Sequence, residues 1–496
     1  MTIPLLCSIM VGLLLVAGVV TPGASDPATL IVDTQKIVTP SFMGLGVQWD
    51  PFDYQLTDKQ WQRVESRINY MNPGIFRVCV ASWFYIQGLD DAGNPIYAWN
   101  SGRRDHHFDQ LFKILDYAQK HKVTVLLGEW GCPGKISAGS GSTEIKVQDP
   151  RWPRMIADFL DYLRNKRGYT CIRYYNFVNE PNGDWSGNES YETWETGMRS
   201  LAGELKKHKL DQKITLVGPD ATVTSAWRDG FGWADKVAAR LSDFVGAYDL
   251  HWYAFDEEVR DGSIERVLSE TIRSLRKSDP NAAHKPFMVC ESGILTGKTN
   301  GDQQPRVRTF EYGVMMADYL TQVANSGWMT AIAWDLDDAM HINKGPQTPI
   351  PGSDTLKVWG FWNSLGSAMG RPEDEHPRPW FYVWSVTSRL FPAKSVIVGA
   401  SRLEKTPVRS TTGCSPDGKQ LSMMLVNDST TSQEVLVRVP GRPAGDYKLY
   451  RYTEGNLFTN ADGLAMPAET QLHLDIAKGW QIMIPAQSVL WLTTGK

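Results

Sequence analysis

The sequence predicts an α/β fold, a (β/α)8 barrel followed by an all-β sandwich. Short apolar runs alternate with longer segments of helical periodicity over most of the chain, and this is the pattern of repeated βα units around a parallel sheet. Eight such units can be counted. From about Ser395 the pattern changes to short alternating strands separated by turn signals, which favours a sandwich.

The eight predicted barrel strands fall within residues 41–393, which we assign to the barrel. An open, doubly wound sheet is the rival arrangement, but no glycine-rich phosphate turn follows the first strand, so the closed barrel is favoured. The strands are expected at Met43–Trp49, Ile75–Val80, Val123–Glu129, Ile172–Val178, Ile214–Gly218, Tyr248–Tyr253, Phe287–Cys290 and Thr330–Trp334.

Helical periodicity fills the intervals between these strands. The loops after strands two, three and eight are long, and in a (β/α)8 barrel these loops surround the active-site face. Helices are expected at Asp58–Met71, Phe108–His121, Pro150–Lys166, Tyr191–Lys207, Trp227–Leu241, Ile264–Lys277, Arg306–Ser326 and Pro379–Phe391.

A second domain is expected over residues 394–496, and residues 26–40 are expected to join it. Thr29–Val38 has the pattern of a strand that precedes the barrel, and pairing with the sandwich would tie both ends of the chain into one accessory domain. We expect this domain to pack against the barrel as a structural appendage, with glycan binding as the alternative. Its other strands are expected at Val396–Val398, Leu421–Val426, Glu434–Val439, Tyr447–Tyr452, Gln471–Leu474 and Val489–Leu492.

The first 25 residues have the pattern of a signal peptide. Leu5–Val20 is an apolar run of suitable length, and Gly23-Ala24-Ser25 supplies the small residues needed for cleavage. No Lys or Arg precedes the run, and an uncleaved anchor is the alternative, although the run is short for a membrane span. We therefore expect a secreted, periplasmic or cell-surface protein with no membrane partner after cleavage.

The composition limits the classes of partner. Hydrophobic residues make up 42% and charged residues 21% of the chain, which argues against extended disorder. The net charge is -4 and no long basic run is present, so nucleic acid is not an expected partner. The 19 Trp, 18 Tyr and 17 Phe supply flat rings on which sugars could stack, although many of these rings will fill the core.

The cysteines show no metal-type spacing. One lies in the predicted signal peptide, and the other five are scattered and odd in number. Because Cys79, Cys171 and Cys290 fall inside apolar strand-like runs, we expect buried free thiols rather than a disulfide framework. Two sequons, beginning at Asn188 and Asn427, would carry glycans only in a eukaryotic source.

Two glutamates stand at the C-terminal ends of predicted strands. Glu180, in Asn179-Glu180-Pro181-Asn182, closes the fourth strand, and Glu291 closes the seventh. A carboxylate directly after an apolar strand is costly to bury, so both are expected at the barrel rim, across its mouth from each other. Glycosidic cleavage needs one carboxylic acid to protonate the leaving oxygen and one carboxylate to trap the oxocarbenium-like centre, about 5–5.5 Å apart for retention.

These motifs resemble those of the clan A retaining glycoside hydrolases, and strands one to eight can be laid on that pattern over most of the chain. Within the clan, Asn-Glu-Pro-Asn together with a C-terminal sandwich is most similar to family 39, with families 5, 30 and 51 as neighbours. The resemblance implies that Glu180 is the acid/base and Glu291 the nucleophile.

The resemblance also implies supporting roles for five further residues, with ordinary structural roles as the alternative. Arg77 resembles the arginine beside the nucleophile, whose positive charge would keep Glu291 ionised. Asn179 resembles the residue that hydrogen-bonds the sugar 2-hydroxyl. In His251-Trp252-Tyr253, Tyr253 would donate to the nucleophile and His251 would reach toward the acid/base. Trp334 resembles the tryptophan that floors the subsite for the non-reducing-side sugar.

Other side chains near strand ends are candidates for shaping the sugar subsites, with a structural role as the alternative for each. Glu129 and Asp335 could accept hydrogen bonds from sugar hydroxyls. Asp335–Asp338 resembles a calcium loop only superficially, because the remaining ligands and the late glutamate are missing, so neither a metal nor another cofactor is expected. The candidates are Gln48, Trp49, Asp50, Trp83, Glu129, Trp130, Trp185, Asp335 and Asp337.

The sequence therefore predicts a secreted retaining β-glycosidase that hydrolyses O-glycosidic bonds of oligo- or polysaccharides by double displacement, with a carbohydrate as its partner. A transglycosidase that uses the same residues with a sugar acceptor is one alternative. A carbohydrate-binding barrel that has lost catalysis is another, although binding alone does not need a nucleophile and its supports. A metal-dependent hydrolase is disfavoured because no histidine cluster stands at the strand ends.

Overall fold

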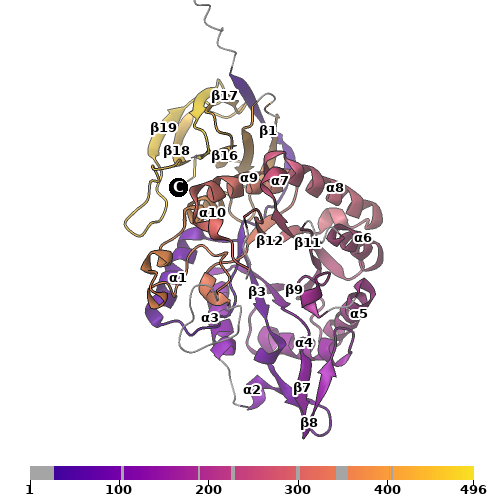
Figure 1. Ribbon diagram of the computed structural model, residues 1–496. Coiled ribbons are helices and arrows are strands. Elements are labelled where there is room, and N and C mark those ends of the chain that lie inside the picture. Colours follow the sequence, from indigo (N-terminus) through magenta and orange to yellow (C-terminus); the bar gives the residue numbers. More distant parts are fainter. Residues whose placement is uncertain are drawn as a thin grey trace, which may run out of the picture.

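The chain folds into a barrel surrounded by helices, with a β-domain packed against it (Figure 1). The computed structural model describes residues 27–101, 106–187, 190–224, 229–297, 302–341, 356–401, 403 and 406–495. The predicted signal peptide and the sequon at Asn188 lie outside the described residues. Within these ranges, no helix is both long enough and apolar enough to span a membrane.

Eight parallel strands close into the barrel, in the order β10-β11-β12-β13-β2-β3-β6-β9 around the ring. Each is followed along the chain by a helix of the outer layer, so the predicted (β/α)8 barrel with a C-terminal β-domain is confirmed. The strands are β2 (Gly46–Gln48), β3 (Ile75–Val80), β6 (Thr124–Glu129), β9 (Ile172–Asn176), β10 (Thr215–Thr222), β11 (Val245–Ala254), β12 (Phe287–Ile294) and β13 (Thr330–Ala333).

The outer helices form where apolar residues recur at helical spacing and polar residues cap the ends. The first helix begins with a capping box in which Thr57 and Gln60 exchange side-chain and backbone hydrogen bonds, and it ends at Asn72 in the left-handed conformation. The helices are α1 (Asp58–Met71), α3 (His106–His121), α4 (Arg151–Asp161), α5 (Tyr191–Lys207), α6 (Gly230–Arg240), α8 (Ser263–Ser278), α9 (Phe310–Ser326) and α10 (Pro379–Leu390), with two short ones, α2 (Ala98–Ser101) and α7 (Asp256–Arg260).

A small second sheet lies outside the barrel ring and was not predicted. It is built from the long loops after β3 and β6, in the order β5-β4-β7-β8. Its strands are only three to five residues long and largely polar on their exposed sides, so they give no clear apolar alternation. The strands are β4 (Ile86–Leu89), β5 (Pro95–Tyr97), β7 (Gly134–Ala138) and β8 (Gly141–Ile145).

The β-domain is a nine-stranded sheet, in the order β19-β18-β21-β16-β15-β14-β1-β17-β20, around its own apolar core. Strand β1 (Ala28–Thr39) pairs in parallel with β17 through its first residues and antiparallel with β14 through the rest. The first described strand of the chain therefore lies inside the C-terminal sheet. The others are β14 (Val396–Ala400), β15 (Arg409–Cys414), β16 (Leu421–Asn427), β17 (Gln433–Arg438), β18 (Gly445–Tyr452), β19 (Glu469–Leu474), β20 (Trp480–Ile484) and β21 (Ser488–Thr493).

An apolar plug fills the barrel interior at the N-terminal half of its strands. Ile75, Leu126, Val217, Met288 and Ile332 are fully buried there together with Ala247 and Cys290. Cys79 and Cys171 are buried as well, as the sequence predicts. The plug closes one end of the barrel, so polar side chains in the interior gather at the other end, where the strands reach their C-termini.

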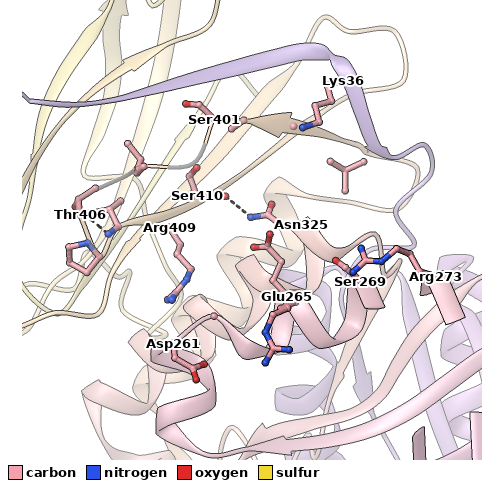
Figure 2. Close-up of a pocket in the computed structure, with 18 residues that line it drawn as sticks. Lys36, Asp261, Glu265, Ser269, Arg273, Asn325, Ser401, Thr406, Arg409 and Ser410 are labelled. Carbon is pink, nitrogen blue, oxygen red and sulfur yellow. Dashed lines mark hydrogen bonds between the residues drawn. The ribbon is translucent and has the colours of Figure 1, made fainter. Parts of the chain in front are cut away.

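The β-domain is joined to the barrel by apolar and ionic contacts. Trp491 of β21 is fully buried, lies 6.2 Å from the ring of Tyr382 in α10, and donates Nε1–H to Thr387 Oγ1 at 3.1 Å. Arg409 of β15 pairs with the buried Asp318 of α9. Beside this contact an open pocket of about 660 Å³ lies between α8 and the edge of the β-domain, lined mainly by polar side chains (Figure 2).

We predict that Trp491→Ala lowers the free energy of unfolding by about 3–5 kcal/mol, because it leaves a cavity where the β-domain packs on α10. Urea unfolding of the two proteins measures the difference. Met483→Ala, on the exposed part of β20 where the side chain is 51% exposed, is the matched control and should change stability by no more than about 0.5 kcal/mol. Equal effects of the two substitutions would show that this junction carries no stability.

Candidate active site

Glu180 and Glu291 meet at the C-terminal end of the barrel. Glu180 follows β9, and Glu291 lies within β12. The ladder between β12 and β13 shifts register between Val289 and Ser292, and such an irregularity lets two successive residues enter the interior. Cys290 accordingly belongs to the apolar plug, while Glu291 is hydrogen-bonded among the polar groups above it.

The two carboxyl groups are close together. His251 Nδ1 lies 3.1 Å from Glu180 Oε1 and 3.5 Å from Glu291 Oε2, and one oxygen of each glutamate lies within 4.8 Å of the other. The Glu180 side chain is 13% exposed and that of Glu291 is 5% exposed. Glu180 is thus the more solvent-exposed glutamate, and Glu291 is the more deeply buried one.

Glu291 is held by donors on both carboxylate oxygens. Arg77 Nη1 donates to Oε1, and the Tyr253 hydroxyl donates to Oε2 at 2.5 Å. Burial raises the pKa of Glu291, and the positive charges of His251 and Arg77 act in the opposite direction. These partners are the ones predicted for Arg77 and Tyr253.

Arg77 is fully buried and contacts four barrel segments at once. Besides Glu291, its guanidinium donates to Gln48 Oε1 at 2.5 Å, to Asn179 Oδ1 at 2.7 Å and to Asp220 Oδ2 at 3.0 Å. Asn179, the residue before Glu180, is therefore fixed in orientation by a buried cation.

The Glu180 backbone adopts a conformation that is uncommon for a residue with a side chain. Its φ is +43°, in the left-handed region that favours glycine. Two backbone hydrogen bonds hold it: Glu180 N–H donates to the Asp220 carbonyl at 3.0 Å, and the Glu180 carbonyl accepts from Gly183 N–H at 2.8 Å. Strain of this kind is found where a structure must aim a particular side chain.

His251 is buried between carboxylates. Its Nε2 lies 2.7 Å from Asp220 Oδ1, opposite the Nδ1 that faces Glu180. Burial by itself lowers the pKa of His251, but the charges of Glu291 and Asp220 outweigh it and raise the pKa to about 10. His251 is therefore an imidazolium at neutral pH, with a proton to donate on each nitrogen.

An aromatic wall stands beside the glutamates at the end of β13. Trp334 lies 6.3 Å from the ring of Tyr253 and 5.7 Å from that of Trp359. Lys357, paired with Asp302 at 3.0 Å, lies 5.1 Å from the Trp334 ring. The wall combines flat rings with charged groups that can bond hydroxyls.

Several polar side chains of this region are buried without a hydrogen-bond partner among the residues that the structure describes, and two of them are consecutive at the end of β13. These two are Trp334, through Nε1, and Asp335, through both carboxyl oxygens. Burial raises the pKa of Asp335 well above its ordinary value, and the neighbouring Asp338 and Asp337 add to the effect. A neutral carboxyl can donate as well as accept, and buried groups of this kind are seldom left unbonded in proteins without a ligand or functional reason.

Trp130 lies at the same mouth. Trp130 is partly exposed, and its ring meets the ring of His341 edge-on at 5.4 Å. The ring of Trp334 stacks on the same histidine at 6.0 Å. Among the predicted subsite residues, the structure thus brings Trp130 and Trp334 together around His341, and Trp334 contacts the ring of Tyr253, which holds Glu291.

Three other predicted subsite residues have structural positions instead. Trp49 is fully buried between barrel and helices, 5.4 Å from the ring of Tyr117 in α3 and 5.9 Å from that of Trp61 in α1. Strand residues alternate between the two faces, so the inward side chain at this strand end is Gln48, whose amide bonds Arg77 and Asp50. Trp49 was a candidate for shaping a sugar subsite, with a structural role as the alternative, and its burial assigns it the structural role.

The carboxyl groups of Asp50 and Glu129 also accept their hydrogen bonds from other protein groups. Asp50 accepts from Gln48 Nε2 at 2.7 Å and from the Cys79 N–H at 2.6 Å. Glu129 is fully buried and accepts from the hydroxyls of Tyr85, Tyr175 and Ser82 at 2.8, 3.2 and 3.1 Å. Their carboxyl groups tie barrel segments together, and the expected bonds to sugar hydroxyls are replaced by these internal ones.

The remaining candidates divide between surface and core. Trp83 and Trp185 are more than half exposed, and Asp337 is fully buried with bonds to Trp362 and Ser364.

Several residues of the site were not predicted. Asp220, His341, Lys357 and Trp359 are all absent from the candidates drawn from the sequence. Asp220 follows Gly218-Pro219 at the end of an apolar strand, so the criterion that found Glu180 and Glu291 would have found it had the strand been drawn to its full length.

The comparisons with known proteins show the fold. No protein-family model matches the chain, and no curated protein sequence matches it. Among solved structures, a family 39 glycoside hydrolase (GH39) from Xanthomonas axonopodis pv. citri is 15% identical, with a TM-score of 0.63 over 95% of this chain and 97% of that one. A GH30 endoxylanase from Clostridium papyrosolvens C71 is 14% identical, with a TM-score of 0.63 over 95% and 100%. A monomeric β-xylosidase from Caulobacter crescentus CB15 is 14% identical, with a TM-score of 0.62 over 94% and 99%.

The chain therefore has the fold shared by these clan A glycoside hydrolases, barrel and β-domain together. Family 39, the one predicted from the sequence motifs, is among the families with this fold.

We predict that stability depends on the protonation of Glu129. Burial raises its pKa from 4.5 to about 8, although the Tyr85, Ser82 and Tyr175 hydroxyls act to lower it. Between these two pH values the folded protein binds a proton that the unfolded chain has released, so the stability contributed by the neutral acid is complete below pH 4.5 and is lost as the pH rises through about 8. Glu129→Gln keeps a neutral group of the same shape and should not show this loss.

Urea unfolding of both proteins at pH 5 and pH 9 measures the effect. The wild type should lose stability relative to Glu129→Gln at the higher pH. A difference between them that is the same at both pH values would contradict the assignment of Glu129 as a buried neutral acid.

Proposed function

We propose that this protein is a secreted retaining β-glycosidase, with Glu180 as the acid/base and Glu291 as the nucleophile. The observation that carries the proposal is the pair of glutamates whose oxygens lie within 4.8 Å at the C-terminal end of the barrel. Retaining glycosidases hold their two carboxyl groups about 5–5.5 Å apart, whereas inverting ones leave about 6.5–9.5 Å for a water molecule. The spacing here supports the retaining reaction.

In the first step Glu291 attacks the anomeric carbon while Glu180 gives its proton to the leaving oxygen. The hydrogen bonds from Arg77 and Tyr253 occupy the Glu291 oxygens in the resting site, which favours the ionised form needed for attack. In the second step Glu180 takes a proton from water, and the sugar leaves with its configuration retained. Neither step needs a group from outside the chain other than water.

The substrate proposed is a carbohydrate with a β-linked sugar, and xylosides are the first to test. Solved structures with this fold include an endoxylanase and a β-xylosidase. The apolar N-terminal run supports export, since polysaccharide substrates lie outside the cell.

We predict that Glu291→Ala abolishes turnover of aryl β-glycosides without unfolding the protein. Glu180→Ala should be slow mainly on substrates with poor leaving groups, which need the proton most, and azide should restore its activity by replacing the general-base step. Steady-state kinetics over a series of aryl leaving groups, with circular dichroism as the folding check, measures both. Near wild-type activity in either variant would refute the assignment.

We further predict that Asp335→Ala impairs sugar binding and leaves stability intact. Neither carboxyl oxygen has a partner to lose within the described part of the chain, and removing a buried unbonded polar group should not destabilise the fold. A lost hydrogen bond to a sugar hydroxyl corresponds to a fall in kcat/KM of about tenfold. Kinetics and thermal unfolding of the variant test this, and a stability loss with unchanged kcat/KM would assign Asp335 to the fold instead.

A further inference from the structure

Asp220 connects the charged groups around the two glutamates, and the role inferred for it rests on the proposed function. It lies in β10, where the ladder to β11 shifts register between Gly218 and Ala221, and its φ is +58°. A residue with a side chain is uncommon in this left-handed region. Asp220 is 1% exposed, and Arg77 and His251 occupy its two carboxyl oxygens, so it is placed to act on other protein groups rather than on the sugar.

Four contacts define its position. Its carboxylate accepts from Arg77 Nη2 at 3.0 Å and lies 2.7 Å from His251 Nε2. Its backbone N–H donates to Asp249 Oδ1 at 2.7 Å, and its carbonyl accepts from Glu180 N–H at 3.0 Å. One residue therefore touches the arginine behind the nucleophile, the histidine beside both glutamates and the backbone of the acid/base.

The protonation of His251 decides how Glu180 can use its proton. With a proton on Nδ1, His251 donates to Glu180 Oε1, and the transferable proton of Glu180 must then sit on Oε2, where the substrate can take it. Without that proton, Nδ1 becomes an acceptor and draws the Glu180 proton toward itself, away from the leaving oxygen.

The charges of Glu291 and Asp220 favour the imidazolium over the neutral ring, and Asp220 is the one that contacts Nε2. A neutral His251 bonded to Asp220 through Nε2–H would leave Nδ1 bare. The charged groups that face His251 from other segments are Asp220 from β10, Glu180 after β9, Glu291 from β12 and Arg77 from β3. The buried carboxyl of Asp249, on the same strand as His251, also interacts with it electrostatically. Of these carboxylates, Asp220 lies nearest to the His251 ring, 2.7 Å from Nε2. Glu180 and Glu291 lie at the other ring nitrogen, Nδ1.

We propose that Asp220 is a positioning residue that keeps the proton on His251 Nδ1 and thereby turns the acidic proton of Glu180 toward the leaving group. Asp220 itself does not touch the reacting atoms. Its charge acts through His251, and its backbone carbonyl holds the left-handed backbone of Glu180 in place.

The test is Asp220→Asn in the full chain, because this change removes the charge and keeps both the side-chain shape and the backbone carbonyl. Without the charge, His251 loses its second proton at a lower pH. The basic limb of the kcat/KM profile should therefore move to lower pH by at least about one unit, with kcat on poor leaving groups falling about 10- to 100-fold, a part of the roughly 10²–10⁴-fold that general acid–base catalysis contributes.

A matched control is Asp279→Asn, which changes a buried carboxyl that pairs with Lys285 and accepts from the Tyr248 hydroxyl rather than bonding any group that faces His251. It should leave the basic limb where it is in the wild type. A merely structural role would lower kcat/KM by the same factor at every pH. If the basic limb of the Asp220→Asn profile of kcat/KM against pH stays at the wild-type pH, the proposal is therefore overturned, however low the activity is.

A second measurement does not depend on the folding of the variant. Nitrogen-15 NMR of histidine-labelled wild type, with the His251 signal assigned from its loss in His251→Asn, reports the protonation of the ring directly. We expect an imidazolium through pH 8, and a neutral ring at pH 7 would overturn the proposal. If the wild type hydrolyses no glycoside yet His251 is an imidazolium, the proposed function fails and the role of Asp220 in charging His251 stands.

Discussion

The buried guanidinium of Arg77 is the interaction on which the site depends. A charge inside a barrel is tolerated only when hydrogen-bonded partners surround it. Arg77 reaches Gln48, Asn179, Asp220 and Glu291, and these come from four different segments of the ring. The cost of leaving this cation unpaired fixes the relative positions of those segments, and with them the nucleophile and the residue beside the acid/base.

His251 adds a second positive charge to the same centre, and the carboxylates of Asp220 and Glu291 balance the pair. The apolar plug beneath keeps water from one side, which makes these charge interactions stronger than they would be near the surface. Glu180 stands at the edge of the cluster and is the most exposed of its carboxyl groups. A group at that position can exchange a proton with a substrate while the others stay fixed.

Much of this could be predicted from the sequence. Alternating apolar runs and helical segments predicted all eight barrel units, and two glutamates at strand ends predicted the groups that meet at the mouth. The limits of the strands were less certain, because β10, β11 and β12 continue through polar residues once their apolar runs end. For this reason Asp220 was missed. Its importance comes from contacts with Arg77 and His251, far away along the chain, and such contacts leave no local pattern.

The direction of a side chain was the other limit. Trp49 and Gln48 are neighbours at one strand end, and only the strand's alternation in three dimensions sends the glutamine inward and the tryptophan to the helices. Glu129 likewise stands at a strand end, as Glu180 and Glu291 do, but Tyr85 and Tyr175 occupy its oxygens. A carboxylate at a strand end is therefore a candidate for chemistry, and its partners decide whether it is available.

The most direct test of the double displacement is to trap its covalent intermediate. Aryl 2-deoxy-2-fluoro-β-glycosides, beginning with the xyloside, slow the second step and should add the mass of one fluorosugar to the wild-type chain. Peptide mapping should then place that mass on Glu291. A label carried by any other residue, or rapid hydrolysis of the parent glycoside with inversion at the anomeric carbon, would contradict the account.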